Sequence, residues 1–187
     1  MDEKPKLSVG LRARRLPQRA GWLMASLLAA GCGQSPPPLA AVRGVDLDRF
    51  MGRWYVIANI PTFLELGAHN AVESYERDPD GTIATTFTFR RGAFDGQPVE
   101  YRPRGYVSEE SPAVWGMQFV WPIKAEYRIA YIASDYSRTI VARSARDYVW
   151  IMARTPELSP EDYASLVTFV GELGYDTTKL KQVPQRW

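Results

Sequence analysis

The residue types that most often carry chemistry are scarce in this chain of 187 residues. It contains one cysteine, Cys32, and one histidine, His69. These counts exclude an internal disulfide, a zinc cluster of cysteines and histidines, and a metal site with several histidines. Because no Ser-His-acid set is available either, we predict no catalytic residue, no metal and no cofactor. We expect His69 in a solvated loop; a role as a haem ligand or a pH sensor is the alternative.

The residues before Cys32 indicate a different use for its thiol. Residues 1–19 carry six lysine and arginine side chains, and residues 20–30 form an uncharged apolar stretch that ends in small residues. This order is typical of a secretory signal peptide. The stretch rises only about 16 Å as a helix, too little to cross a hydrocarbon core of roughly 30 Å.

Residues 28–32, Leu-Ala-Ala-Gly-Cys, resemble the lipobox of bacterial lipoproteins, in which the cysteine is acylated and becomes the new N-terminus after cleavage. We therefore expect a lipoprotein signal peptide over residues 1–31, lipid attachment at Cys32 with a proline-rich tether over residues 32–43, and one domain over residues 44–187. The glycine after the cysteine indicates the outer membrane. Ordinary signal cleavage, which would leave a spare thiol, and twin-arginine export are the alternatives.

Removal of residues 1–31 would change the charge balance. The segment holds six positive and two negative side chains, so the net charge falls from +2 to −2 for the remaining 156 residues. No basic surface of the kind that binds nucleic acid is predicted. The whole chain is 45% hydrophobic, 12% aromatic and 24% charged, which is close to globular averages and excludes wholesale disorder or a coiled coil.

The elements that must position a binding site are short and alternating. Between residues 53 and 154, apolar and polar residues alternate in stretches separated by turn residues, which predicts an all-β barrel or sandwich. The eight predicted strands cover residues 54–60, 71–77, 82–91, 98–107, 113–121, 126–133, 138–144 and 147–154. Most connections are short enough for hairpins, so consecutive strands should pair. The exception, residues 61–70, contains the cluster Phe63-Leu64-Glu65-Leu66 and is a candidate lid.

After the strands, the apolar spacing changes to that of a helix. Ser159 is a predicted N-cap, followed by a proline and two acidic residues, and Gly174 is a predicted C-terminal stop. The apolar stripe, which we expect to pack on the outside of the sheet, comprises Tyr163, Leu166, Val167, Val170 and Leu173. A partner-binding stripe is the alternative. Residues 179–183 are predicted to return as a short ninth strand.

Three motifs carry a resemblance to a known family. Gly52-Arg53-Trp54 opens the first predicted strand, Ser134-Asp135-Tyr136 lies in the turn between the sixth and seventh, and Arg154 ends the eighth. In this order the motifs resemble the signature of lipocalins, and they span nearly the whole expected mature chain. The resemblance implies an all-β fold, an eight-stranded antiparallel up-and-down barrel with one C-terminal α-helix packed outside.

Two further stretches narrow the resemblance. Residues 146–151 and 154–156 look like the bacterial outer-membrane lipoprotein lipocalins, a Blc-like group with plant and apolipoprotein D-related members. Two positions depart from that group. Ser134 replaces the usual acidic or threonine residue of the turn, and Val56 stands where the group often has glutamate. The second departure implies a drier cavity floor.

The resemblance assigns structural roles to Gly52, Trp54, Asp135, Tyr136 and Arg154. Trp54 is expected to close the base of the barrel. The guanidinium of Arg154 is expected across its indole, a contact that contributes about 0.5–2 kcal/mol. These five residues are therefore not predicted to contact a ligand; a partner-facing role for the closed end is the alternative.

Strand alternation and the resemblance together predict the interior of the barrel. An inward Trp54 places Val56 and Ala58 inside as well. The residues predicted to bind the ligand are Val56, Ala58, Glu73, Tyr75, Phe87, Phe89, Trp115, Met117, Phe119, Tyr127, Ile129, Tyr131 and Trp150. The other residues predicted to face inward are Ile83, Thr85, Tyr101, Gly105, Val107, Ile140, Ala142, Tyr148 and Met152. Such apolar and aromatic walls suit an acyl chain.

Polar groups are few in this interior set. Tyr127 and Tyr131 would offer hydroxyls to a headgroup nearer the mouth. An inward Glu73 would be protonated, paired with Arg102 or Arg104, or in contact with a zwitterionic headgroup.

The sequence thus predicts a lipid-anchored lipocalin that binds, stores or transports a fatty acid or a lysophospholipid in the bacterial envelope, and not an enzyme. Its predicted partners are the lipophilic small molecule and the outer membrane, which it reaches through the anchor. No nucleic acid is expected, and a homodimer is left open. The alternatives are a structural or partner-binding envelope lipoprotein with an incidental cavity and, last, an envelope-stress enzyme.

Overall fold

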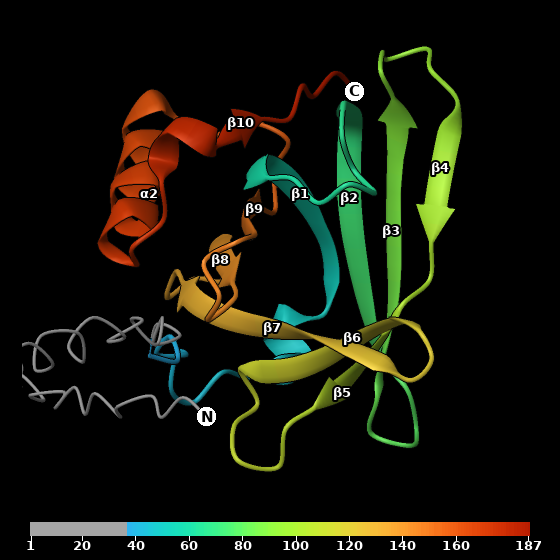
Figure 1. The fold of residues 1–187 in the computed structure, drawn as a ribbon, viewed down its shortest axis with the longest axis vertical. Helices are drawn as coiled ribbons and strands as arrows, with labels where there is room; N and C mark the ends of the chain where they lie inside the picture. The colour runs from blue at the N-terminus through green and yellow to red at the C-terminus, as the bar shows by residue number, and fades with distance from the viewer. Residues whose placement is uncertain (1–36) are drawn as a thin grey trace, which may run out of the picture. The chain divides into compact units, whose positions relative to one another are not determined.

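Strands β1 to β9 form a closed antiparallel barrel (Figure 1). The structure is a computed structural model that describes residues 37–187, so the predicted signal peptide and the predicted lipid attachment at Cys32 lie outside the described residues. The strands are β1 (Gly52–Ile60), β2 (Ala68–Arg77), β3 (Ile83–Arg91), β4 (Pro98–Tyr101), β5 (Arg104–Val107), β6 (Val114–Val120), β7 (Ile123–Ile132), β8 (Arg138–Ala142) and β9 (Val149–Ala153). The barrel closes because β9 pairs with β1.

The predicted fold class is confirmed, with one strand interrupted. β4 pairs with β3 alone, whereas β5 pairs with both β3 and β6, so the two together fill one of eight positions in the barrel. The interruption falls at Arg102-Pro103, where the proline has no N–H to donate to a ladder. β2 begins at Ala68, earlier than predicted. His69 therefore lies at the start of a strand and not in a loop.

The predicted C-terminal helix is also confirmed. α2 (Pro160–Glu172) begins at Ser159, whose side chain accepts a hydrogen bond from the backbone N–H of Asp162. Leu166 and Val170 of its apolar stripe are buried against the outer face of the barrel. Figure 1 shows α2 beside β8 and β9, across the barrel from β4. In residues 37–187, no helix has the length and apolar character needed to cross a bilayer.

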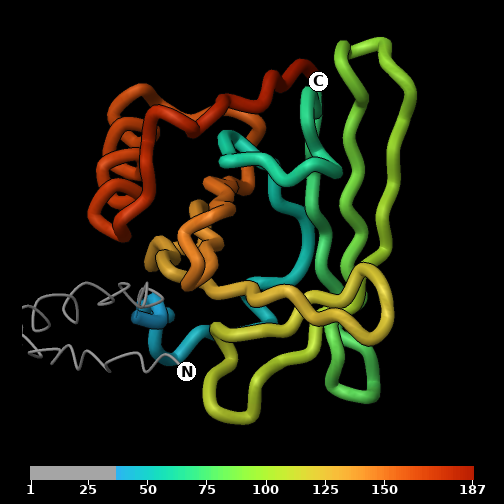
Figure 2. Tube along the Cα trace, in the orientation of Figure 1, coloured from blue at the N-terminus to red at the C-terminus, as the bar shows by residue number. Residues whose placement is uncertain are grey.

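The C-terminal tail forms the predicted ninth strand. After the short helix η1 (Thr177–Lys179), β10 (Lys181–Gln182) pairs with β1 through Ala58 and Asn59. The tail then passes beside the start of β2 (Figure 2), where the N–H of Asn70 donates to the carbonyl of Pro184 at 2.8 Å.

Two β-bulges change which side chains face the interior. In β1 the register with β9 shifts between Val56 and Ala58, and in β7 the register with β8 shifts between Ile129 and Tyr131. A bulge adds one residue and thereby reverses the alternation beyond it. Ala58 consequently packs outside, in the cluster beneath α2, and Tyr131 lies against Phe169 of α2 with ring centroids 5.4 Å apart. The predicted inward orientation of Ala58 and Tyr131 is wrong for this reason.

The residues of β8 predicted to face the interior are wrong by one position. Val141 belongs to the interior cluster, whereas Ile140 and Ala142 belong to the cluster between the barrel and α2. Because α2 covers the outer face, β8 is apolar on both faces. Its sequence therefore shows no alternation from which the inward face could be read.

The chain before β1 packs along the barrel. Leu39 is buried, its carbonyl accepts from Arg128, and its N–H donates to the hydroxyl of Ser144. The carbonyl of Pro37 accepts from Arg146, in the hairpin between β8 and β9. Residues 39–43, which the sequence analysis assigned to the tether, thus pack on the domain.

The five signature residues lie together at the end of the barrel where β1 begins, the closed end. The guanidinium carbon of Arg154 lies 3.7 Å from the ring centroid of Trp54. The guanidinium donates hydrogen bonds to the carbonyls of Arg49, Phe50, Met51 and Arg53. Gly52 has a backbone φ of 89°, a value that residues other than glycine rarely adopt. This arrangement fixes the short helix α1 (Leu47–Phe50) across the base of the barrel.

The turn between β7 and β8 completes the closed end. Asp135 accepts hydrogen bonds from the backbone N–H and the hydroxyl of Ser137. The hydroxyl of Tyr136 accepts from the N–H of Asp46, the N-cap of α1, at 2.8 Å. The closed end is therefore held by hydrogen bonds between segments far apart in sequence.

Candidate ligand-binding cavity

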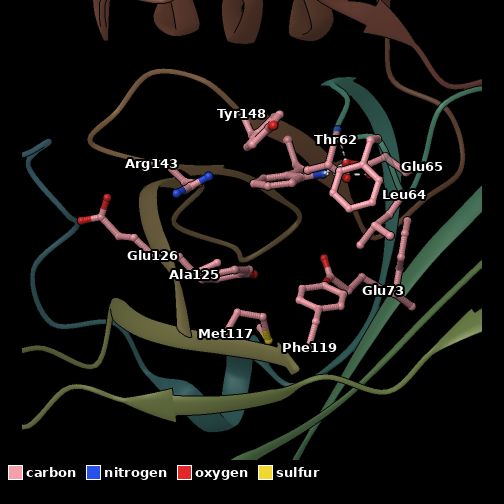
Figure 3. Close-up of a pocket in the computed structure, with 14 residues that line it drawn as sticks. Thr62, Leu64, Glu65, Glu73, Met117, Phe119, Ala125, Glu126, Arg143 and Tyr148 are labelled. Atoms are coloured by element: carbon pink, nitrogen blue, oxygen red, sulfur yellow. Dashed lines mark hydrogen bonds between the residues drawn. The ribbon is translucent and has the colours of Figure 1, made fainter. Parts of the chain in front are cut away.

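A cavity of about 190 Å³ opens at the other end of the barrel, the open end, where the hairpins β1–β2, β6–β7 and β8–β9 meet (Figure 3). Most of its walls are aromatic and aliphatic. The lining residues are Thr62, Phe63, Leu64, Glu65, Glu73, Phe87, Met117, Phe119, Ala125, Glu126, Tyr127, Arg143, Tyr148 and Trp150. Ligand pockets commonly have about 300–1,000 Å³, so this cavity receives only part of a long ligand unless the loops at its mouth move.

An aromatic cluster forms the floor of the cavity. Trp115 and Tyr127 stack with ring centroids 4.8 Å apart, and the hydroxyls of Tyr75 and Tyr127 are 2.6 Å apart. Phe50, from α1, fills the space beneath, 5.5 Å from Tyr75 and 5.6 Å from Trp115 between ring centroids. Gly105 allows the close approach of β3 and β5 beside this cluster, since a Cβ there would lie 3.2 Å from the Cβ of Ile83 and 3.4 Å from Trp115. The lower half of the barrel is therefore filled by side chains.

The loop between β1 and β2, residues 61–67, covers part of the mouth. Its Glu65 is 4% exposed and points inward, where both carboxylate oxygens accept from the indole N–H of Trp150 at 3.1 and 3.2 Å. The carboxylate also accepts from the backbone N–H of Thr62. Burial raises the pKa of Glu65, and these hydrogen bonds oppose the rise. Glu65 thus fastens the predicted lid to the wall of the barrel.

Glu73 projects into the cavity from the middle of β2, between Trp54 on β1 and Phe87 on β3. Burial raises the pKa of Glu73 to about 7; the hydroxyl of Tyr75 opposes the rise and the charge of Glu65 adds to it. Arg102 and Arg104 were the cations predicted from the sequence to pair with an inward Glu73. The structure contradicts both pairings.

The two arginines are engaged on the outside of the barrel. Arg102 pairs with Glu100 at 2.6 Å, and Arg104 pairs with Asp80 at 3.1 Å and with Asp78 at 3.4 Å. Glu73 therefore forms no ion pair with any residue that the structure describes.

The rim opposite these glutamates carries one positively and one negatively charged side chain. Figure 3 shows Glu65 and Glu73 on one side of the cavity and Arg143 and Glu126 on the other. Arg143 pairs with Asp147 at 2.9 Å. Burial favours a higher pKa for Glu126, but hydrogen bonds from Ser144 and Arg128 outweigh it and lower the pKa. The rim charges are thus compensated, unlike the carboxyl of Glu73.

The structure sorts the residues predicted to bind a ligand into three groups. Those that line the cavity are Glu73, Phe87, Met117, Phe119, Tyr127 and Trp150. Those that lie in the interior cluster without lining the cavity are Val56, Tyr75, Phe89, Trp115 and Ile129. Ala58 and Tyr131 lie outside the barrel. The hydroxyl of Tyr127 is bound to Tyr75 at the floor, so neither predicted tyrosine offers a hydroxyl to a headgroup at the mouth.

The prediction of ligand-binding residues missed several lining residues at the mouth, among them Glu65, Glu126 and Arg143. Glu65 carried a usable signal, because it is a single acidic residue within the apolar cluster of the predicted lid. Glu126 and Arg143 gave none, since charged residues next to turns are ordinarily solvated.

The described residues show no arrangement suited to catalysis at this cavity. His69 lies on the outside of the open end, where its Nδ1 is 3.0 Å from the carbonyl of Gly67 and its ring meets Phe94 edge-on at 5.0 Å. No group of three or more candidate metal ligands exists within residues 37–187. The arrangement that is present, apolar walls with one uncompensated carboxyl, is suited to binding an amphiphile.

Comparisons with known proteins agree with this geometry. The family model described as a lipocalin-like domain matches residues 45–185. Temperature-induced lipocalin-1 of Arabidopsis thaliana is 31% identical over 154 residues, which cover 79% of this chain and 83% of that protein. The outer membrane lipoprotein Blc of Citrobacter freundii is 26% identical over 166 residues, 86% of this chain and 92% of that protein. The solved structure of insecticyanin from Manduca sexta has the same fold, with a TM-score of 0.60, 16% identity, and coverage of 79% of this chain and 85% of that one.

Proposed function

The chain belongs to the lipocalin family, whose members bind small hydrophobic ligands, and on that premise we propose that it is a lipid-anchored carrier of a fatty acid or a lysophospholipid in the bacterial envelope. The observation that carries the proposal is the cavity, whose walls are largely apolar and which opens at one end only, above the aromatic floor. Each methylene buried there contributes about 0.8 kcal/mol. Because ordering of a flexible chain offsets part of this gain, we expect micromolar or tighter affinity.

Exposed apolar side chains around the mouth support exchange of the ligand with a lipid surface. At the tip of the β6–β7 hairpin, Trp121 is 82% exposed, and its neighbours Val120 and Ile123 are also exposed. Phe63 and Leu66 are exposed on the loop between β1 and β2. Tryptophan favours the interface between water and lipid. An amphiphile could therefore pass between a bilayer and the cavity without crossing water.

The path of the N-terminal segment supports the same orientation. Pro37 is hydrogen-bonded to Arg146 in the β8–β9 hairpin, at the open end. Five residue steps separate Pro37 from Cys32, a reach of at most about 17 Å. A lipid on Cys32 would hold the mouth of the barrel close to the membrane. The similarity to an outer membrane lipoprotein of Citrobacter freundii agrees with this proposed anchor.

We propose a carrier and not an enzyme. In the described residues, the cavity has no cysteine, and His69 lies outside it, so no nucleophile with an adjacent base is present. The second candidate, a structural or partner-binding lipoprotein with an incidental cavity, is favoured by one observation. Side chains of the interior cluster fill the barrel below the floor, which leaves a cavity of only about 190 Å³.

Native mass spectrometry with lipid extraction tests the proposal. The compact unit of residues 35–187 contains both hydrophobic clusters, so it is the part to express in the periplasm and purify without detergent. A stoichiometric co-purifying fatty acid or lysophospholipid is the expected result. An empty barrel that also leaves its tryptophan fluorescence unchanged on addition of either lipid would favour the structural alternative.

A further inference from the structure

Glu73 is an ionisable group without a compensating charge in the part of the cavity that a ligand must enter. It lies two residues before Tyr75 on β2, just above the aromatic floor, and faces Phe87 across the β2–β3 pair. The neighbouring hydroxyl of Tyr75 is shared with Tyr127. A partly buried carboxyl among apolar walls is costly unless it is protonated or meets a donor, and the cavity leaves space for a ligand to supply one.

The other charged groups around the cavity do not compensate Glu73. The titratable groups that face it are Glu65 from the β1–β2 loop, Tyr75 from β2 and Tyr127 from β7, none of which is a cation. β3 and β6 contribute only Phe87, Met117 and Phe119 to the lining. The rim adds the titratable residues Glu126, Arg143 and Tyr148. Arg143, the single cation among the lining residues, is paired with Asp147. The interior is therefore acidic.

We propose that Glu73 selects the ligand by its inserted end: the cavity accepts an amphiphile that inserts an ammonium group or another hydrogen-bond donor, and it discriminates against one that inserts a carboxylate. The inference rests on the proposed carrier function and names the ligand class for the same site. A donor at the inserted end satisfies the carboxyl of Glu73, whereas a carboxylate places a second negative charge beside Glu73 and Glu65. A site built around a buried polar group rejects ligands that leave it unpaired.

The size of the cavity fits this mode of binding. With about 190 Å³ available, the polar end and the first part of the chain fill the space above the floor. The remainder of the chain lies along the apolar rim of Phe63 and Phe119, and Phe119 is two residues from Trp121 at the exposed hairpin tip. A fatty acid can bind in the opposite direction, with its carboxylate at the rim and its methyl end over Glu73, but then the ligand supplies no donor to that carboxyl.

The proposed contact gives opposite pH dependences for two classes of ligand. Because burial raises the pKa of Glu73 to about 7, its charge changes near neutrality. An alkylammonium ligand should bind more tightly as the pH rises through this range, since the carboxylate forms. An alkanoate should bind less tightly over the same range. Each slope is at most about tenfold per pH unit for one titrating group.

The experiment compares dodecylamine, dodecanol and dodecanoate, which share one alkyl chain, by tryptophan-fluorescence titration of the unit 35–187. The proteins are the natural sequence, Glu73→Gln and Glu76→Gln. The last variant is the matched control, because Glu76 lies on the same strand and is exposed on its outer face. At about pH 8.5 we expect the natural protein to bind dodecylamine at least about tenfold more tightly than dodecanoate, the size of one charge-assisted contact. We expect Glu73→Gln to abolish this preference and Glu76→Gln to preserve it.

Three outcomes overturn the inference, and they are distinguishable. If the natural protein binds all three ligands with similar affinity, the cavity is a carrier site without the proposed selection. If the preference for dodecylamine persists in Glu73→Gln, another group carries it. If none of the ligands binds the natural protein, the carrier function fails and the inference falls with it. Near-UV circular dichroism of Glu73→Gln establishes that its aromatic floor is intact, and the pH slopes of the natural protein test the contact without any substitution.

Discussion

The closed and open ends of this barrel are built from similar residues but differ in how their polar groups are satisfied. At the closed end, Arg154 donates to five carbonyls and covers Trp54, so its charge is compensated by fixed partners. At the open end, Glu73 faces a cavity without a compensating charge, and Trp121 is exposed. The difference indicates that fixed contacts stabilise the closed end, whereas the open end keeps a carboxyl and an indole without fixed partners, as the proposed binding of a ligand and a lipid surface requires.

The largest change in the free energy of unfolding should come from a substitution at the closed end. Arg154→Ala removes donors from several carbonyls and the cation over Trp54, and we expect it to lower the free energy of unfolding by about 3–5 kcal/mol. Arg77→Ala is the control, because Arg77 forms an exposed pair with Asp48 at the same end and should change stability by less than about 1 kcal/mol. Urea denaturation measures both. A loss below about 1 kcal/mol for Arg154→Ala would show that the clamp is not stabilising.

The next effect, at the open end, depends on pH. The pKa of Glu73 is about 7 in the folded protein and near 4.5 when unfolded, so the folded state binds more protons between these values. The stability of the natural protein should therefore fall as the pH rises through this window, by up to about 3 kcal/mol. Glu73→Gln should remove this fall and be more stable than the natural protein at about pH 8, with little difference near pH 4.

Thermal unfolding across this pH range, with Glu76→Gln as the control, measures the effect. Parallel stability profiles for the natural protein and Glu73→Gln would show that Glu73 titrates as an exposed carboxyl. The open end would then hold no unsatisfied polar group, and the two ends would not differ in this respect.

A smaller effect should come from the lid. Trp150→Phe keeps an aromatic wall but removes the indole N–H that binds Glu65, which leaves a buried carboxylate with one donor fewer. We expect a loss of about 1–2 kcal/mol in the free energy of unfolding and several-fold faster release of a bound amphiphile in stopped-flow measurements. Trp187→Phe is the control, since Trp187 lies at the exposed C-terminus. Unchanged release by Trp150→Phe would mean that the loop does not gate the cavity.

The smallest effect on stability is expected at the hairpin tip. Trp121→Ser should change the free energy of unfolding by less than about 0.5 kcal/mol, because the side chain is largely exposed. The same change should reduce binding of the unit 35–187 to vesicles of phosphatidylethanolamine and phosphatidylglycerol several-fold in a flotation assay. Trp187→Ser, which removes an exposed tryptophan elsewhere, should leave vesicle binding unchanged. Equal losses for the two variants would argue against a membrane contact at the open end.

The two ends also differ in how far the sequence predicted them. The closed end depends on a few residues with characteristic spacing, such as Gly52, Trp54 and Arg154, and the structure places them together as expected. The open end depends on strand parity and on loops. Parity was predicted wrongly for Ala58 and Tyr131, since bulges follow from three-dimensional pairing and leave no clear mark in the sequence.

The candidate site shows the same limit. The apolar residues Phe87, Met117, Phe119 and Trp150 line the cavity, as strand alternation predicted. The inward position of Glu73 followed from alternation as well. The absence of an ion pair did not, because Arg102 and Arg104 are bound to other carboxylates on the outside of the barrel. Partners of a buried charge depend on register between distant strands, which composition and periodicity do not determine.

The tryptophans can show whether a ligand engages the open end of the barrel and leaves the closed end unchanged. Each indole N–H reports one position: Trp54 and Trp115 donate to backbone carbonyls at the closed end and the floor, whereas Trp150 donates to Glu65 in the cavity. We would follow these resonances by NMR while titrating the unit 35–187 with dodecylamine. We expect a saturable shift of the Trp150 resonance while that of Trp54 stays in place. A stationary Trp150, or equal shifts of Trp150 and Trp54, would contradict this expectation.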